Sequence, residues 1–121
     1  MARRIAMPES VLIGPHTFSL NVNSAAVDAE CVRSGRTLFG YTELGAQSIF
    51  LVGAPRLVGT MLREVAVHEC LHAIFDSCGL SHGLRQNNTY SEEALVQSID
   101  TAVLSLMRDN PALVAWLTAE D

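Results

Sequence analysis

The sequence predicts one α+β domain, residues 1–121, in which a small, mostly antiparallel sheet packs on one side of a long helix. Residues 16–22 alternate apolar and polar side chains, which is typical of a half-buried strand. Residues 55–79 form a long, mainly apolar run with helical spacing, and residues 92–108 show a second helical face. A chain of 121 residues suits one compact domain with one core.

The composition limits the classes of partner and compartment. The chain is 49% hydrophobic, so disorder is not expected, and its net charge of −5 provides no basic stripe for nucleic acid. Three cysteines at irregular spacing imply no disulfide framework. No signal peptide follows the basic start, and no segment has the length and apolarity of a membrane span. We therefore expect a cytoplasmic protein without a membrane partner.

The first part of the chain is expected to begin irregularly. Residues 1–15 carry two prolines and a glycine with little periodicity, which predicts a loosely attached arm. The strand at 16–22 follows, and Asn23 or Ser24 can then cap a short helix. Gly35 is expected to end this helix.

Two short strands are expected to lead into the long helix. Residues 37–42 and 47–52 should pair as an antiparallel hairpin, with a turn around Gly45. Pro55 suits the first turn of the following helix, and Gly79 suits its end. This helix should run through the middle of the domain because it is apolar on most sides. Its two expected stripes are Val58, Met61, Leu62, Val65, His68, Glu69, His72 and Phe75, and Val67, Leu71, Ile74 and Cys78.

The last third of the chain is expected to hold a loop and two helices. Residues 80–90 are polar and rich in asparagine, which predicts a loop over or beside the long helix. Ser91 can cap the helix at 92–108, and Asn110 with Pro111 should start a short final helix. The side chains expected to close the core from this final helix are Leu113, Val114, Trp116 and Leu117.

The chemistry of the sequence is concentrated in the stretch His68-Glu69-Cys70-Leu71-His72. Two histidines four residues apart lie one turn apart on a helix, so both imidazoles can reach one metal ion. Glu69 projects toward the same site and could accept a proton from an attacking water molecule. The pattern predicts a zinc hydrolase site with His68 and His72 as metal ligands and Glu69 as general base. The alternative is that both histidines are ordinary core residues.

A third protein ligand is expected from the helix at 92–108. At about 100° per residue, Leu95, Val96, Ile99 and Val103 lie within about 60° of Glu92, whereas Glu93 lies about 100° away. An inward carboxylate is costly unless a cation meets it, which favours Glu92 as the zinc ligand. Glu93 remains the alternative, because a helix start can be misplaced by one residue.

The run Val65-Ala66-Val67-His68-Glu69-Cys70-Leu71-His72-Ala73-Ile74 resembles the extended zincin signature. A glutamate on a following helix resembles the gluzincin branch, including ImmA/IrrE-type peptidases and small phage-encoded metallopeptidases. The resemblance covers roughly residues 39–116. It implies a minimal zincin-like domain, a Zn²⁺ cofactor and hydrolysis of a peptide or protein substrate. It also implies that the strand nearest the motif helix, here 47–52, pairs with an extended peptide.

Other interpretations of the sequence stay open. Larger gluzincins add a helical domain with a residue that stabilises the oxyanion, and this chain has no room for such a domain. Tyr90, His82 and Arg85 are candidates for that role. A zinc-stabilised binding module and a metal-dependent amidase acting on a small or cell-wall substrate are the alternative functions. Cys70 lies on a stripe of small residues that suits close packing better than ligation. The oligomeric state and the substrate are not predicted.

Overall fold

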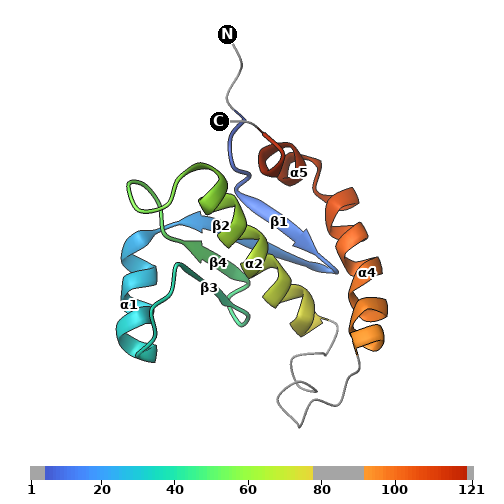
Figure 1. Ribbon diagram of the computed structural model, residues 1–121, viewed down its shortest axis with the longest axis horizontal. Helices are drawn as coiled ribbons and strands as arrows, with labels where there is room; N and C mark the ends of the chain where they lie inside the picture. Colours follow the sequence, from blue (N-terminus) through green and yellow to red (C-terminus); the bar gives the residue numbers. More distant parts are fainter. Residues whose placement is uncertain (1–4, 78–91, 120–121) are drawn as a thin grey trace.

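The computed structural model describes residues 5–77 and 92–119, and it confirms the α+β fold class. One mixed sheet of four strands and four helices make up this described part of the chain (Figure 1). The elements in chain order are β1 (Ser10–Ile13), β2 (His16–Val22), α1 (Ser24–Ser34), β3 (Gly40–Glu43), β4 (Ser48–Leu51), α2 (Gly59–Ser77), α4 (Glu92–Asp109) and α5 (Pro111–Leu117).

The strand order in the sheet is β1-β2-β4-β3. The pair β3–β4 is antiparallel, as the predicted hairpin requires. The pair β1–β2 is also antiparallel, whereas β2 and β4 run parallel. The chain passes from β2 through α1 before it returns to the sheet, and such a crossover allows the parallel pairing. The prediction that residues 47–52 form the peptide-pairing strand is wrong, because β4 is hydrogen-bonded on both sides. The two edge strands are β1 and β3, and of these β3 directly follows α1 in the chain.

The prediction of a loosely attached arm is wrong for the part of residues 1–15 that forms β1. Val11 and Ile13 are buried, and β1 pairs with β2 along its whole length. The other side of β1 is held by Asn110. The Leu12 amide donates to Asn110 Oδ1 at 2.7 Å, and Asn110 Nδ2 donates to the Leu12 carbonyl at 2.8 Å. The sequence does not predict this strand because its apolar run, residues 11–13, is short and lies between Pro8 and Pro15.

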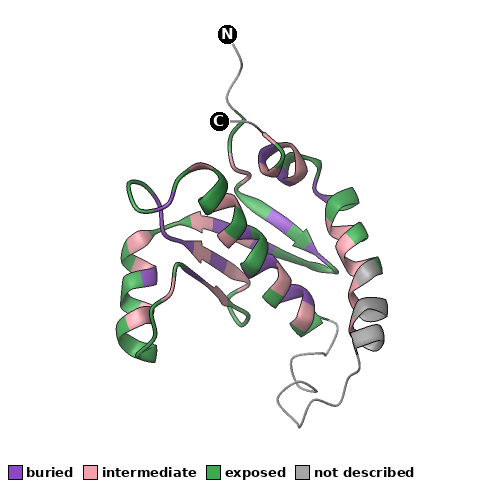
Figure 2. Cartoon of the chain, viewed as in Figure 1, coloured by how far each residue is buried: buried purple, intermediate pink, exposed green. Residues whose placement is uncertain are grey.

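The core lies between one face of the sheet and the helices α2, α4 and α5 (Figure 2). The sheet contributes buried residues at alternate positions, as the period of a strand requires. Helix α2 crosses this face (Figure 1), and its small residues Ala66, Cys70 and Ala73 belong to the core. Val67 and Met61 of the expected apolar stripes are exposed, whereas Ile74 is buried and Leu62, Val65 and Leu71 pack against the core, so the predicted stripes are only partly correct. Its buried residues are Ala66, Glu69, Cys70, Ala73 and Ile74.

The helix boundaries follow the local signals except at the start of α2. Asn23 Oδ1 caps α1 by accepting the Ala26 amide at 3.0 Å, and Gly35 ends the helix in the left-handed conformation at φ 70°. Helix α2 begins at Gly59 rather than at Pro55. A turn precedes it, in which the Leu57 amide donates to the Gly53 carbonyl at 3.2 Å. The predicted end at Gly79 lies outside the described residues.

The final helix closes the core as predicted. Leu113 and Trp116 of α5 are buried, whereas Val114 and Leu117 are only partly covered. Arg63 of α2 packs its guanidinium 5.7 Å from the centre of the Trp116 ring and donates from Nε to the Trp116 carbonyl at 2.8 Å. No helix among residues 5–77 and 92–119 is both long and apolar enough to cross a membrane.

Gly40 allows β3 to approach α2 closely. A Cβ atom at this position would lie 2.9 Å from the Phe50 carbonyl oxygen and 2.9 Å from Val65 Cγ1. The carbonyl belongs to the paired strand β4, so it cannot move aside without disturbing the sheet. The absence of a side chain at Gly40 therefore sets the spacing between β3 and the helix that carries the histidines.

We predict that Gly40→Ala lowers the free energy of unfolding by about 1–3 kcal/mol, the usual cost of overpacking a tight contact. Urea denaturation followed by circular dichroism measures this change. Gly45→Ala is the matched control, because a Cβ at Gly45 would meet no atom within 4 Å. Equal stabilities of the two variants would show that the β3–α2 contact can expand freely.

Candidate functional site

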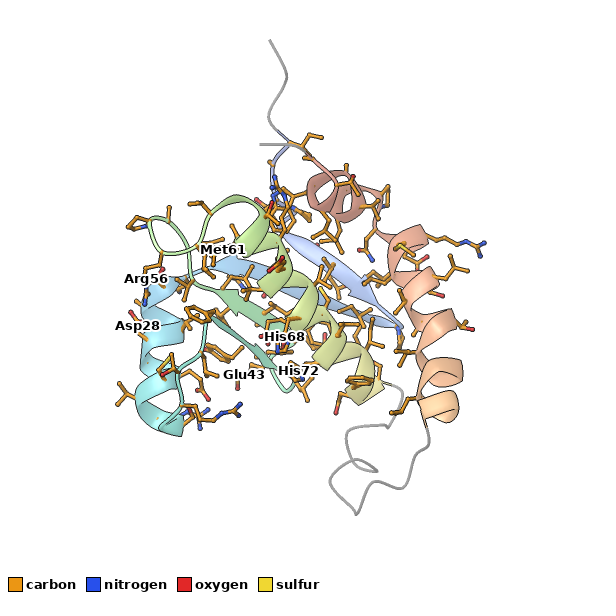
Figure 3. The ribbon with its side chains drawn as sticks, viewed as in Figure 1. Asp28, Glu43, Arg56, Met61, His68 and His72 are labelled. Carbon is orange, nitrogen blue, oxygen red and sulfur yellow. The ribbon has the colours of Figure 1, made fainter. Side chains whose placement is uncertain are left out.

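The two histidines of α2 converge on one point. His68 Nε2 lies 3.1 Å from His72 Nε2, and the rings meet edge to face at 84° with their centroids 4.7 Å apart. Both side chains are exposed on the same side of the helix (Figure 3). The alternative that they are ordinary core histidines is therefore wrong.

The spacing of the two nitrogens fits a shared metal ion. Two imidazole nitrogens bound to tetrahedral zinc at about 2.0–2.1 Å are separated by about 3.3 Å. A hydrogen bond between the rings would give a similar distance, with one Nε2 donating to the other. A zinc site also needs a third protein ligand, and the described residues contain no group of three His, Cys, Asp or Glu side chains that could hold a metal.

The expected third ligand falls outside the described side chains. Helix α4 begins at Glu92, as the sequence predicts, but the side chains of Glu92 and Glu93 are not among those that the structure describes. The preference for Glu92 over Glu93 therefore stays a prediction. Tyr90, His82 and Arg85, the candidates for stabilising an oxyanion, also lie outside the described residues.

Glu69 is held between α2 and the edge strand β3. Its side chain is only 5% exposed, although it stands between two exposed histidines in the sequence. Thr42 Oγ1 donates to Glu69 Oε1 at 2.9 Å and lies 3.1 Å from the Glu69 carbonyl oxygen. The carboxylate is thus buried with a hydrogen-bond donor, as a buried charge requires. Sequence reasoning missed Thr42.

A cleft with a volume of about 970 Å³ opens beside these residues. Its walls are the C-terminal half of α1, the segment 36–39, strand β3 and one side of α2. His68, Glu69 and His72 line the cleft from α2, and Glu43 lines it from the end of β3. Figure 3 labels His68, His72 and Glu43. The two imidazoles and the carboxylate therefore face a space large enough for a short stretch of extended peptide.

Cys70, between the two histidines, faces the core instead of the cleft. Burial, together with the neighbouring Glu69 carboxylate, raises the pKa of the Cys70 thiol to about 12. Metal binding requires the thiolate, which is disfavoured here at neutral pH. This agrees with the prediction that Cys70 serves close packing.

Comparisons with protein-family models, with curated proteins and with solved structures found no match.

Proposed function

We propose that this chain is a zinc-dependent metallopeptidase of gluzincin type. His68, His72 and Glu92 would hold the zinc ion, and Glu69 would act as general base. The observation that carries the proposal is the convergence of the two Nε2 atoms at 3.1 Å on the wall of the cleft that also holds Glu69. A helix presents two imidazoles in this way when the histidines are four residues apart.

Zinc bound at this site would lower the pKa of a water molecule and polarise the carbonyl of the substrate. The residues of the chain then have separate tasks. The imidazoles of His68 and His72 would hold the zinc ion, which requires that both rings are neutral. Glu69 takes a proton from the attacking water and passes it to the leaving amine nitrogen.

The substrate would lie along β3. This strand is at the edge of the sheet and lines the cleft next to Glu69, so its outward backbone groups can pair with an extended peptide. The expected mode of binding is therefore the one that the resemblance implied, but with Gly40–Glu43 in place of residues 47–52. Such pairing recognises backbone more than side chains, which suits a peptide substrate.

The same edge strand favours one alternative, a zinc-stabilised module that binds a protein segment without cutting it. Zinc binding alone does not need a carboxylate at Glu69. The burial of that carboxylate beside the histidines, with a hydroxyl donor provided for it, favours hydrolysis over binding.

A substrate screen tests the proposal. The purified protein, loaded with zinc, is incubated with an unfolded protein, peptidoglycan fragments and small amides, and the products are identified by mass spectrometry. Cleavage of the unfolded protein that stops with a chelator and returns with zinc is the expected result. Cleavage of only peptidoglycan fragments or small amides would indicate an amidase. Binding of the unfolded protein without cleavage would indicate the binding module.

A further inference from the structure

We propose that Thr42 is a positioning residue, whose hydroxyl fixes the Glu69 carboxylate for proton transfer. The inference rests on the proposed function, because it assigns a role within the same site. It concerns a residue on the edge strand β3, outside the motif.

The register of the sheet brings Thr42 to Glu69. Thr42 pairs with Ile49, which is fully buried on the face that α2 covers, so the Thr42 side chain points to the same face. Gly40, two residues earlier, shares this face and lets the strand approach the helix. The 2.9 Å hydrogen bond from Thr42 Oγ1 to Glu69 Oε1 spans the resulting interface.

The contact restrains a side chain that would otherwise be flexible. Glutamate has three rotatable side-chain bonds, whereas threonine is branched at Cβ and stiff. With the hydroxyl of Thr42 on Oε1, the carboxylate would be held in one orientation, with Oε2 as the oxygen that takes the proton. Misplacing a reacting group by about 1 Å can cost about 100-fold in rate.

In the reaction that this orientation serves, Glu69 takes up one proton and gives it back. An O–H bond of water breaks as a C–O bond to the substrate carbonyl carbon forms, and the Glu69 carboxylate takes the proton. The peptide C–N bond then breaks, and the same proton goes to the leaving nitrogen. Glu69 returns to its carboxylate form, with Thr42 donating to it again.

Two substitutions separate the hydroxyl from the shape of the side chain. Thr42→Val keeps the shape and removes the donor, and Thr42→Ser keeps the donor. We expect Thr42→Val to lower kcat by about 10- to 100-fold, with KM and bound zinc unchanged within about twofold. Thr42→Ser should stay within about threefold of the wild-type kcat. Thr17→Val, an exposed strand threonine outside the cleft, is the control.

A second measurement needs no activity. In the metal-free protein, Thr42→Val should lower the melting temperature by several degrees, because a buried carboxylate loses its donor. The same substitution in a Glu69→Ala background should have no effect larger than that of Thr17→Val. This double-mutant cycle isolates the contact between the two side chains.

Each outcome bears on one of the two proposals. An unchanged kcat in Thr42→Val, or an equal loss in Thr42→Ser, would overturn the positioning role even if the protein cleaves peptides. If the wild-type protein cleaves nothing, the proposed function fails and with it the catalytic part of this inference. The double-mutant cycle would then still decide whether Thr42 fixes Glu69, and zero coupling would refute it.

Discussion

Glu69→Gln is expected to lower kcat for peptide hydrolysis by about 100-fold or more, since general-base catalysis contributes about 10²- to 10⁴-fold. The amide of glutamine can still accept the hydrogen bond from Thr42, so the fold and the position of the side chain should be kept. The glutamine amide cannot take a proton from water at neutral pH. Bound zinc should be unchanged, because the proposed ligands are untouched. Initial rates on the peptide found by the screen, with metal content measured in parallel, test this expectation.

Glu64→Gln is the matched control for this substitution. Glu64 is an exposed carboxylate that lines the same cleft, one turn before His68. Its removal changes the charge of the cleft equally, so a loss confined to Glu69→Gln would point to proton transfer. An undiminished rate in Glu69→Gln would remove Glu69 from the mechanism.

Glu92→Ala is expected to weaken zinc binding by about 100-fold or more. Substitution of residues that only support a ligand already costs about 10- to 100-fold, and the loss of a ligand should cost more. The affinity is measured by competition with a chromophoric chelator at constant pH, because protons compete with zinc for the ligands.

Glu93→Ala provides the control one position along the same helix. It should bind zinc as the wild type does, since its predicted direction lies about 100° from that of Glu92. The reverse result would move the third ligand to Glu93. Equal affinities in both variants would place the third ligand elsewhere.

Local patterns in the sequence were sufficient for most elements. The alternation in β2 and the capping residues Asn23 and Gly35 predicted their elements correctly, because these signals act within a few residues. The strand order could not be predicted in this way. Nothing in the hairpin pattern indicates whether β3 or β4 docks beside β2, and this choice depends on the crossover through α1. The packing face of α2 is predicted only in part, since Cys70 and Ile74 are buried as expected whereas Met61 is exposed.

The candidate site, too, could be predicted only in the part that depends on local sequence. The spacing of His68 and His72 placed both rings on one side of α2, because helical periodicity fixes that relation. The contact between Thr42 and Glu69 joins residues 27 positions apart, and it depends on the register of β3 against β4. The sequence does contain a signal, since Gly40 and Thr42 are two residues apart and therefore share one face of the strand. This signal becomes informative only when it is known that α2 covers that face.

The proposed zinc site on α2 is tested most directly by the metal content of the purified protein, measured by mass spectrometry beside that of His72→Ala. About one zinc ion per chain is expected for the wild type and much less for His72→Ala. His16→Ala, which removes an exposed histidine outside the cleft, should keep the wild-type content. A folded wild-type protein that holds no metal and takes up no added zinc would contradict the account. The 3.1 Å approach of the two imidazoles would then be a hydrogen bond between neighbouring rings.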